Sequence, residues 1–227
     1  IRKYSKTDFD MLINAQDLRQ ISASLDDSYK TTVEKAANGG KADYLTVENE
    51  MWKAYYLELS QYIKKHCKKD DVQTLFGSSI DIHNIMRIFR LRGYFDYTVD
   101  EIIPFIIRPS YRLKDSVISE LCSSGGIKEF MSVLKNTPYR QLAAAESGTE
   151  LETLSAKFLR DKAGKVLHFS ESAPAVIYAY MIHKSYETDK IKIIIESIRY
   201  NLNREMIDSY VGTKAKANQS YRSGGEV

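Results

Sequence analysis

Residues 76–95 read FGSSIDIHNIMRIFRLRGYF, and this stretch predicts the fold class more directly than any other part of the chain. From Ile80 to about Tyr94, apolar side chains recur every three or four positions, which is the period of an α-helix with one buried face. The glycine and serines at 77–79 predict a loop before that helix. The side chains expected to point into the core are Ile82, Ile85, Ile88 and Phe89.

A ridge of polar side chains runs beside this apolar face and consists of Asp81, Asn84, Arg87 and Arg90, with Arg92 close by. Asp81 is expected near the helix start, where a carboxylate complements free amide groups, and both Asp81 and Asn84 are natural partners for a neighbouring arginine. The ridge either joins packed helical units through hydrogen-bonded ion pairs, which we favour, or presents basic charge to a partner protein. At least one of Arg90 and Arg92 should reach solvent or a partner.

Capping chemistry and chain breaks predict helices throughout the rest of the sequence. Helix starts are indicated by the capping boxes Thr98 with Glu101 and Thr149 with Glu152, by the weaker pair Thr7 with Asp10, and by Pro174. The expected helices cover residues 8–25, 28–37, 46–66, 70–76, 99–106, 114–121, 127–135, 139–146, 174–202 and 204–210. Since no stretch alternates like a β-strand, the sequence predicts an all-α fold.

The second half of the chain repeats the element order of the first half. The equivalent positions are Tyr29 with Tyr139, Glu50 with Glu152, Trp52 with Leu154, Tyr56 with Phe158, and Asp81 with Glu187. We therefore expect two similar helical-bundle lobes related by pseudosymmetry, each built on a unit of about 105 residues. Residues 1–97 form the first repeat, 98–211 the second with 98–122 as a connection, and 212–227 a flexible tail. Lys190 and Ile193 replace Asn84 and Arg87, so the second repeat lacks the polar ridge.

Composition argues against catalysis and against nucleic acid as a partner. The net charge of +3 comes from 33 basic and 30 acidic residues that are intermixed, as on an ordinary solvated surface. Cys67 and Cys122 fit neither a metal site nor a disulfide framework, and no apolar run is long enough to span a membrane. Metal-ligand spacings and phosphate-binding glycine loops are absent, so we expect no catalytic, cofactor-binding or metal-binding residues and no small-molecule substrate.

The stretch at 76–95 resembles the corresponding part of the C subunit of V/A-type ATPases, the counterpart of the eukaryotic d subunit. The resemblance continues in the same order through PFII at 104–107, SYRLK at 110–114, NTPY at 136–139 and ESIRYNL at 196–202. It covers residues from about Phe9 to Tyr210, and the combination of motifs is more specific than any one of them. The chain looks like the second and third repeats of that family without the first, either naturally or because the chain was cut.

The resemblance implies a part of a three-lobed funnel that sits on the proteolipid ring of the membrane sector and receives the central shaft subunits D and F. Such a subunit is non-catalytic, lies peripherally on the cytoplasmic face of the membrane, and couples the shaft to the ring for ion transport linked to ATP hydrolysis or synthesis. The candidate structural or partner-contact residues are Asp81, Asn84, Arg87, Arg90, Arg92, Tyr94, Glu187 and Arg199.

Two other functions fit the same sequence. A free-standing helical scaffold or adaptor protein would use the same amphipathic faces to dock partner helices. A nucleic-acid binder would use Arg87, Arg90, Arg92 and Arg199, and its binding would weaken steeply with salt.

Overall fold

The computed structural model describes residues 6–38, 44–67 and 70–211, and within these ranges the chain is helical with no β-strand. The prediction of an all-α fold is confirmed. The first half contains α1 (Phe9–Ile13), α2 (Leu18–Ser24), α3 (Asp27–Asn38), α4 (Tyr44–His66) and α5 (Asp71–Phe95). The second half contains α6 (Val99–Ile102), η2 (Ile103–Phe105), α7 (Asp115–Ser123), α8 (Ile127–Lys135), η3 (Arg140–Ala144), α9 (Gly148–Phe169), α10 (Ala173–Arg199) and α11 (Arg204–Val211).

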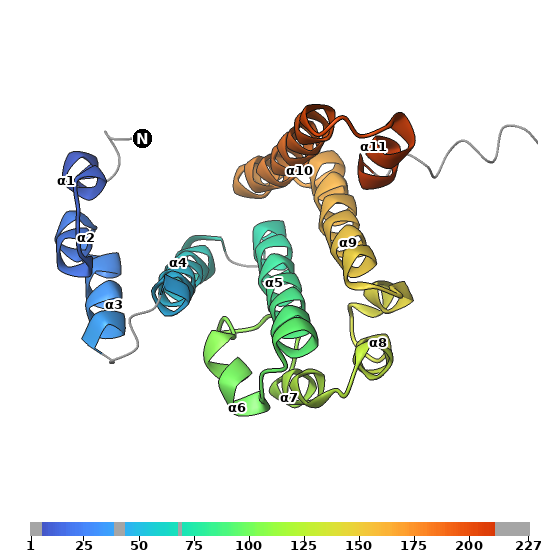
Figure 1. Cartoon of the computed structure of the whole chain (residues 1–227), viewed down its shortest axis with the longest axis horizontal. Coiled ribbons are helices and arrows are strands. Elements are labelled where there is room, and N and C mark those ends of the chain that lie inside the picture. The colour runs from blue at the N-terminus through green and yellow to red at the C-terminus, as the bar shows by residue number, and fades with distance from the viewer. Residues whose placement is uncertain (1–5, 39–43, 68–69, 212–227) are drawn as a thin grey trace, which may run out of the picture.

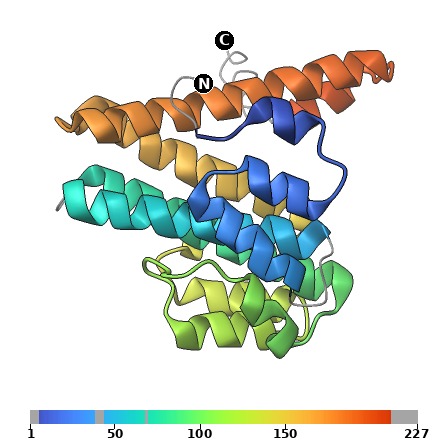
Figure 2. The same cartoon turned by 90° about the vertical axis from the view of Figure 1, so that its left-hand side faces the viewer.

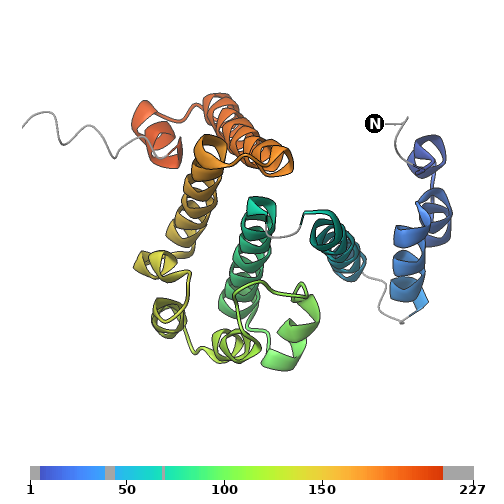
Figure 3. The ribbon, with the colours of Figure 1, turned by 180° about the vertical axis from the view of Figure 1, so that it is seen from behind.

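Helix α5 lies at the centre of the molecule. It packs against α4 on one side and α9 on the other, with α10 near its N-terminal end and α6 and α7 near its C-terminal end (Figures 1 and 3). The three helices α1–α3 are joined to the rest through the packing of α3 on α4, and they form an outer layer that faces the viewer in Figure 2. The central position of α5 makes it the element through which the other layers are connected.

Helix α5 is longer than predicted, because the expected loop at 77–79 is helical and fuses the predicted helices 70–76 and 80–94. The hydroxyls of Ser78 and Ser79 donate to the carbonyls of Thr74 and Leu75 one turn earlier, at 2.7 and 3.1 Å, so both serines are accommodated within the helix. Gly77 is required by a close approach, since a Cβ at this position would lie 2.4 Å from Cγ of Tyr111. Tertiary packing therefore overrides the local loop signal.

Other helix boundaries confirm or correct the capping predictions. The box of Thr98 with Glu101 is present, but the N-cap of α9 lies two residues earlier than predicted, at Ser147 in place of Thr149, because the Ser147 hydroxyl accepts the N–H of Glu150 at 3.2 Å. Thr7 is not the cap of α1, since the Asp8 side chain holds that position. The predicted helix 8–25 is divided into α1 and α2, 99–106 into α6 and η2, and 139–146 is the short 3-10 helix η3.

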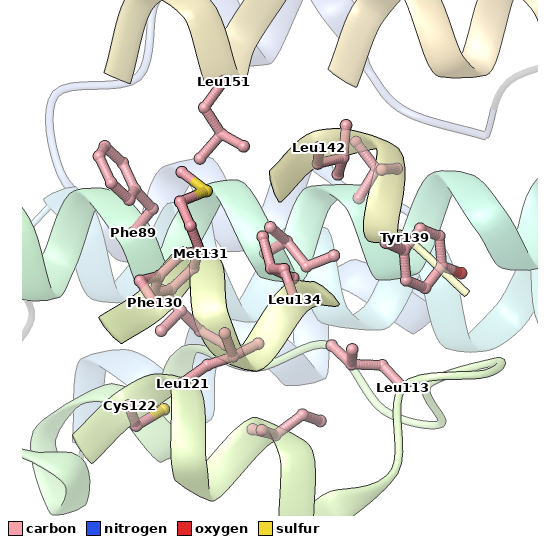
Figure 4. Packing of buried hydrophobic residues seen from close by; sticks show 14 of the residues in the cluster. Phe89, Leu113, Leu121, Cys122, Phe130, Met131, Leu134, Tyr139, Leu142 and Leu151 are labelled. Atoms are coloured by element: carbon pink, nitrogen blue, oxygen red, sulfur yellow. The ribbon is translucent and has the colours of Figure 1, made fainter. Parts of the chain in front are cut away.

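The largest hydrophobic core joins α5 to the segments that follow it. Ile82, Ile85, Ile88 and Phe89 are buried in it, as the sequence predicts. Figure 4 shows Phe89, Met131 and Leu151, from α5, α8 and α9, packed near one another. This core lies across the predicted boundary between residues 97 and 98, so α5 is built into the second half of the chain. The lobe boundaries and the pseudosymmetry remain predictions, and the proposed tail at 212–227 lies outside the described residues.

A bilayer-spanning helix would have to be both long and apolar, and none of the helices in the described ranges meets both conditions.

Candidate functional site

The polar ridge of α5 is anchored by Asp81, which is fully buried in the middle of the helix and not near its start. Its Oδ1 accepts the N–H of Tyr111 at 2.8 Å, and its Oδ2 accepts the N–H groups of Arg112 and Leu113 at 2.6 and 3.0 Å. Its partners are therefore backbone amides of a loop far along the chain. The sequence had instead predicted an arginine and the free amides of its own helix as partners. One side chain fixes the path of residues 111–113.

Tyr139 adds a second long-range contact to the same carboxylate. Its hydroxyl donates to Oδ2 of Asp81 at 2.6 Å, and the tyrosine itself is only 1% exposed. Burial, followed by the charge of the Asp81 carboxylate, raises the pKa of Tyr139 above its ordinary value. The neutral hydroxyl therefore remains a hydrogen-bond donor, and Asp81 joins α5 to both the loop and the start of η3.

Asn84 is the next residue of the ridge, and its side chain hydrogen-bonds both the N–H and the C=O of Ile107. Its Nδ2 donates to the carbonyl of Ile107 at 3.0 Å, and its Oδ1 accepts the N–H of Ile107 at 2.9 Å. Asn84 and Ile107 are both fully buried. The side chain thus supplies the hydrogen bonds that this non-helical segment would otherwise lack.

Arg87 connects α5 to α4 and to η2. Its Nη1 donates to Oδ1 of Asn49 at 2.5 Å and to the carbonyl of Phe105 at 2.7 Å. Nδ2 of Asn49 donates in turn to the carbonyl of Pro104 at 3.3 Å. Burial lowers the pKa of Arg87 from its ordinary value. The ridge up to this point joins α5 to residues 104–113 and to α4.

The remaining predicted residues on α5 lie closer to solvent. Arg90 reaches α9, where its Nη2 lies 2.7 Å from the Glu152 carboxylate, and its side chain is 56% exposed. Arg92 donates from Nε to the carbonyl of Ser124 at 3.1 Å and pairs with Asp96 at 2.7 Å. Tyr94 is exposed at the end of the helix, with its ring edge-on to Phe89.

Glu187 and Arg199 do not join the ridge. Both lie on α10, where Glu187 pairs with Lys184 at 2.5 Å and Arg199 is exposed in the last turn. Residues that the sequence did not single out complete the ridge instead. Asn49 receives Arg87, and Nζ of Lys162 on α9 donates to the Ser78 hydroxyl of α5 at 2.7 Å. Neither residue had a sequence signal beyond being polar on an amphipathic helix.

The arrangement suits a rigid joint between helices. The oxygens and nitrogens of Asp81 and Asn84 are engaged by backbone groups and by Tyr139, so these side chains are held in place and are not available to a reacting group. Within residues 6–38, 44–67 and 70–211, no group of three or more His, Cys, Asp or Glu side chains is placed to hold a metal ion. The ridge therefore connects α5 to neighbouring segments through hydrogen bonds.

The family model and the individual relatives that match this chain are all subunits of ATP synthases. The family model described as ATP synthase (C/AC39) subunit matches residues 1–210. The C subunit of the A-type ATP synthase of Methanosarcina mazei is 28% identical over 171 residues, which are 71% of this chain and 46% of that protein. The same subunit of Methanosphaera stadtmanae is 25% identical over 210 residues, which are 86% of this chain and 54% of that protein. The chain thus spans about half the length of the curated relatives that it matches.

Proposed function

Because the chain belongs to the ATP synthase (C/AC39) subunit family, we propose that it is part of a non-catalytic central-stalk subunit of a V/A-type rotary ATPase. In this role it couples the rotating shaft to the membrane ring during ion transport linked to ATP hydrolysis or synthesis. The observation that carries the proposal is the family match over residues 1–210, which includes every helix but the last residue of α11.

The physical requirement of such a subunit is that it transmits force without yielding. Load passes efficiently through packed helices, whereas an unsupported loop deforms. The ridge supports this role, because Asp81 and Asn84 tie the irregular segment 107–113 to a helix of 25 residues. A buried hydrogen-bond network with every member paired rigidifies the structure around it.

The partners that we propose are the shaft subunits D and F on one side and the proteolipid ring on the other. The subunit would lie peripherally on the cytoplasmic face of the membrane, with neither nucleic acid nor a small-molecule substrate as a ligand. We further propose that residues 1–97 and 98–211 correspond to two of three lobes of a funnel. The relatives are about twice as long as the aligned part, which leaves room for a further lobe outside the matched region.

The test is to purify the full-length natural protein from its native membranes under mild detergent. The proposal predicts that the ATPase headpiece and the proteolipid ring are recovered with it in fixed ratio. Recovery of the protein with neither would contradict the proposal and favour the free-standing helical scaffold. Binding to polyanions that is lost between low and moderate salt would favour the nucleic-acid binder.

A further inference from the structure

Helices α1, α2 and α3 form an outer layer that has little hydrophobic core of its own. Among the side chains described in residues 6–38, Val33 is the only hydrophobic one that is buried, at 1% exposed, whereas Met11 and Ile13 are 40% and 76% exposed. By contrast, α5 contributes buried side chains to all three hydrophobic clusters, and none of their members comes from this described part of the chain. Because burial of apolar surface is the dominant stabilising term in folding, the outer layer is only weakly stabilised.

The three helices of this layer are hydrogen-bonded to one another. The N–H of Asp8, the cap of α1, donates to the carbonyl of Ser24 at the end of α2 at 2.7 Å. The Ser22 hydroxyl of α2 lies 3.4 Å from the carbonyl of Lys30 and 3.2 Å from the carboxylate of Glu34, both on α3. Ser22 and Ser24 are both buried. These contacts tie α1, α2 and α3 into one unit, which we call the arm.

The arm meets the rest of the chain mainly where α3 packs on α4. Figures 1 and 3 show α4 between the arm and α5. The interface of α3 with α4 is incompletely filled, because it contains an open hollow of about 380 Å³. This hollow is lined by Tyr29 of α3 and by Val47, Glu48, Met51, Trp52 and Tyr55 of α4. Side chains that border empty space lose dispersion contacts, so this interface is held less firmly than a closely packed one.

Helix α4 itself is fixed to α5 and to segments beyond it. Asn49 accepts a hydrogen bond from Arg87 at 2.5 Å and donates to the carbonyl of Pro104 at 3.3 Å. Further along α4, Ile63 is buried in a hydrophobic cluster with side chains of α5 and α10. The chain is therefore firmly joined between α4 and α5 and weakly joined between α3 and α4.

We propose that the arm is a separate folding unit, which leaves α4 and unfolds cooperatively while the rest of the chain stays folded. The arm unfolds when it leaves, because its helices have 5, 7 and 12 residues and isolated helices shorter than about 12–15 residues are marginal in water. Local opening of this kind occurs in parts of proteins that bury few apolar side chains. In the open form, the face of α4 that carries Met51 and Tyr55 becomes accessible.

The test is hydrogen exchange of the 227-residue chain, followed for single amides by NMR. We expect the amides in the middle of α2 and α3 to share one degree of protection, about 100-fold or more below that of the Ile85 and Ile88 amides of α5, because the arm opens without global unfolding. Low concentrations of urea should accelerate exchange less steeply in the arm than in α5, since opening the arm exposes less surface.

Val33→Ala and Val72→Ala are matched substitutions, because both valines are buried, at 1% and 4% exposed, one in α3 and the other in α5. We expect Val72→Ala to accelerate exchange in α5 about tenfold and to leave the arm unchanged, since the arm opens without disturbing Val72. Val33→Ala should accelerate exchange in both regions, because unfolding of the whole chain includes unfolding of the arm.

The proposal would be overturned if the amides of α2 and α3 exchanged as slowly as those of Ile85 and Ile88, or if they showed no protection at all. It would also be overturned by unrelated exchange rates in α2 and α3, or by an acceleration in the arm of Val72→Ala as large as that in α5. The rates in the parent chain decide the proposal even where Val72→Ala impairs folding. The proposed function does not depend on the outcome, because it concerns which subunits are recovered with the protein.

Discussion

The hydroxyl of Tyr139 lies 2.6 Å from Oδ2 of Asp81, although the two residues are 58 positions apart in the chain. Both are buried, and the same carboxylate also accepts three backbone amides of residues 111–113. Asp81 therefore ties three separate segments together from the middle of α5. If this joint stiffens the subunit, its loss should be measurable as a loss of stability.

Replacing the carboxylate of Asp81 tests the joint directly. In Asp81→Asn an NH₂ group faces backbone N–H donors, so we expect the free energy of unfolding to fall by about 2–4 kcal/mol. Tyr139→Phe removes one donor and leaves the three amides in place, so its cost should be about 1–2 kcal/mol. Urea unfolding followed by circular dichroism measures both. A change below 0.5 kcal/mol for Asp81→Asn, on the roughly 1 kcal/mol scale of a single hydrogen bond, would show that the network adds no rigidity.

The clamp made by Asn84 predicts a local effect. Asn84→Ala leaves the N–H and C=O of Ile107 buried and unpaired, which should cost about 2–4 kcal/mol in total. Hydrogen exchange at the Ile107 amide should accelerate about tenfold or more, because exposing this amide to solvent no longer requires its hydrogen bond to Asn84 to be broken. Asn84→Asp is the control, because it keeps the acceptor for the Ile107 amide. Equal exchange rates in the parent and in Asn84→Ala would contradict the role assigned to Asn84.

Two glycines of α5 form a matched pair. Gly77→Ala puts a methyl group 2.4 Å from Cγ of Tyr111, which is too short for contact, so we expect a loss of about 1–3 kcal/mol. Gly93→Ala meets no atom within 4 Å and should instead stabilise the helix by about 1 kcal/mol. The midpoint temperature of thermal unfolding should therefore fall for Gly77→Ala and rise for Gly93→Ala. A stabilising shift for Gly77→Ala would mean that the loop holding Tyr111 does not lie against α5 as described.

His83 predicts a dependence of stability on pH. Burial, and then the charges of Arg87 and Arg90, lowers the pKa of His83 from 6.5 to about 4. The folded protein thus favours neutral His83, and the stability that this provides is present above pH 6.5 and is lost as the pH falls toward 4. The expected loss is about 3 kcal/mol over that window.

The measurement for His83 is urea unfolding at several pH values between neutral and about 4. Carboxylates also titrate at the acidic end of this range, so the informative quantity is the difference between the parent and His83→Phe. Phenylalanine keeps an aromatic ring beside Trp52 and Tyr56 and cannot be charged. The difference in stability should change with pH, and a constant difference would show that the pKa of His83 is the same in the folded and unfolded chains.

The sequence predicted which side chains of α5 share a face, because helical periodicity depends only on spacing along the chain. It identified the buried face of Ile82, Ile85, Ile88 and Phe89 and the neighbouring polar ridge. It did not predict that residues 107–113 lie against that ridge, since no local pattern in either segment encodes the pairing. Asp81 was accordingly assigned to a helix start and to an arginine partner, and the structure corrects both.

Local signals failed where two of them competed. Ser147 and Thr149 each stand three residues before a glutamate, so both fit the capping pattern, and only the structure shows that Ser147 is used. The sequence predicted the helix at 174–202 but not which of its side chains are covered by other elements. Ile177, Ile191, Ile195 and Ile198 are each more than half exposed in this structure. Glu187, predicted as the equivalent of Asp81, is exposed and paired with Lys184, so the repeat remains a prediction.

The coupling role is tested most directly by comparing ATP hydrolysis with ion transport in reconstituted vesicles that contain the ATPase with and without this subunit. The proposed role predicts that removal of the subunit leaves ATP hydrolysis by the headpiece in place while ATP-driven ion transport is lost, and that adding the full-length protein back restores transport. Ion transport that continues undiminished in complexes lacking the subunit would contradict it.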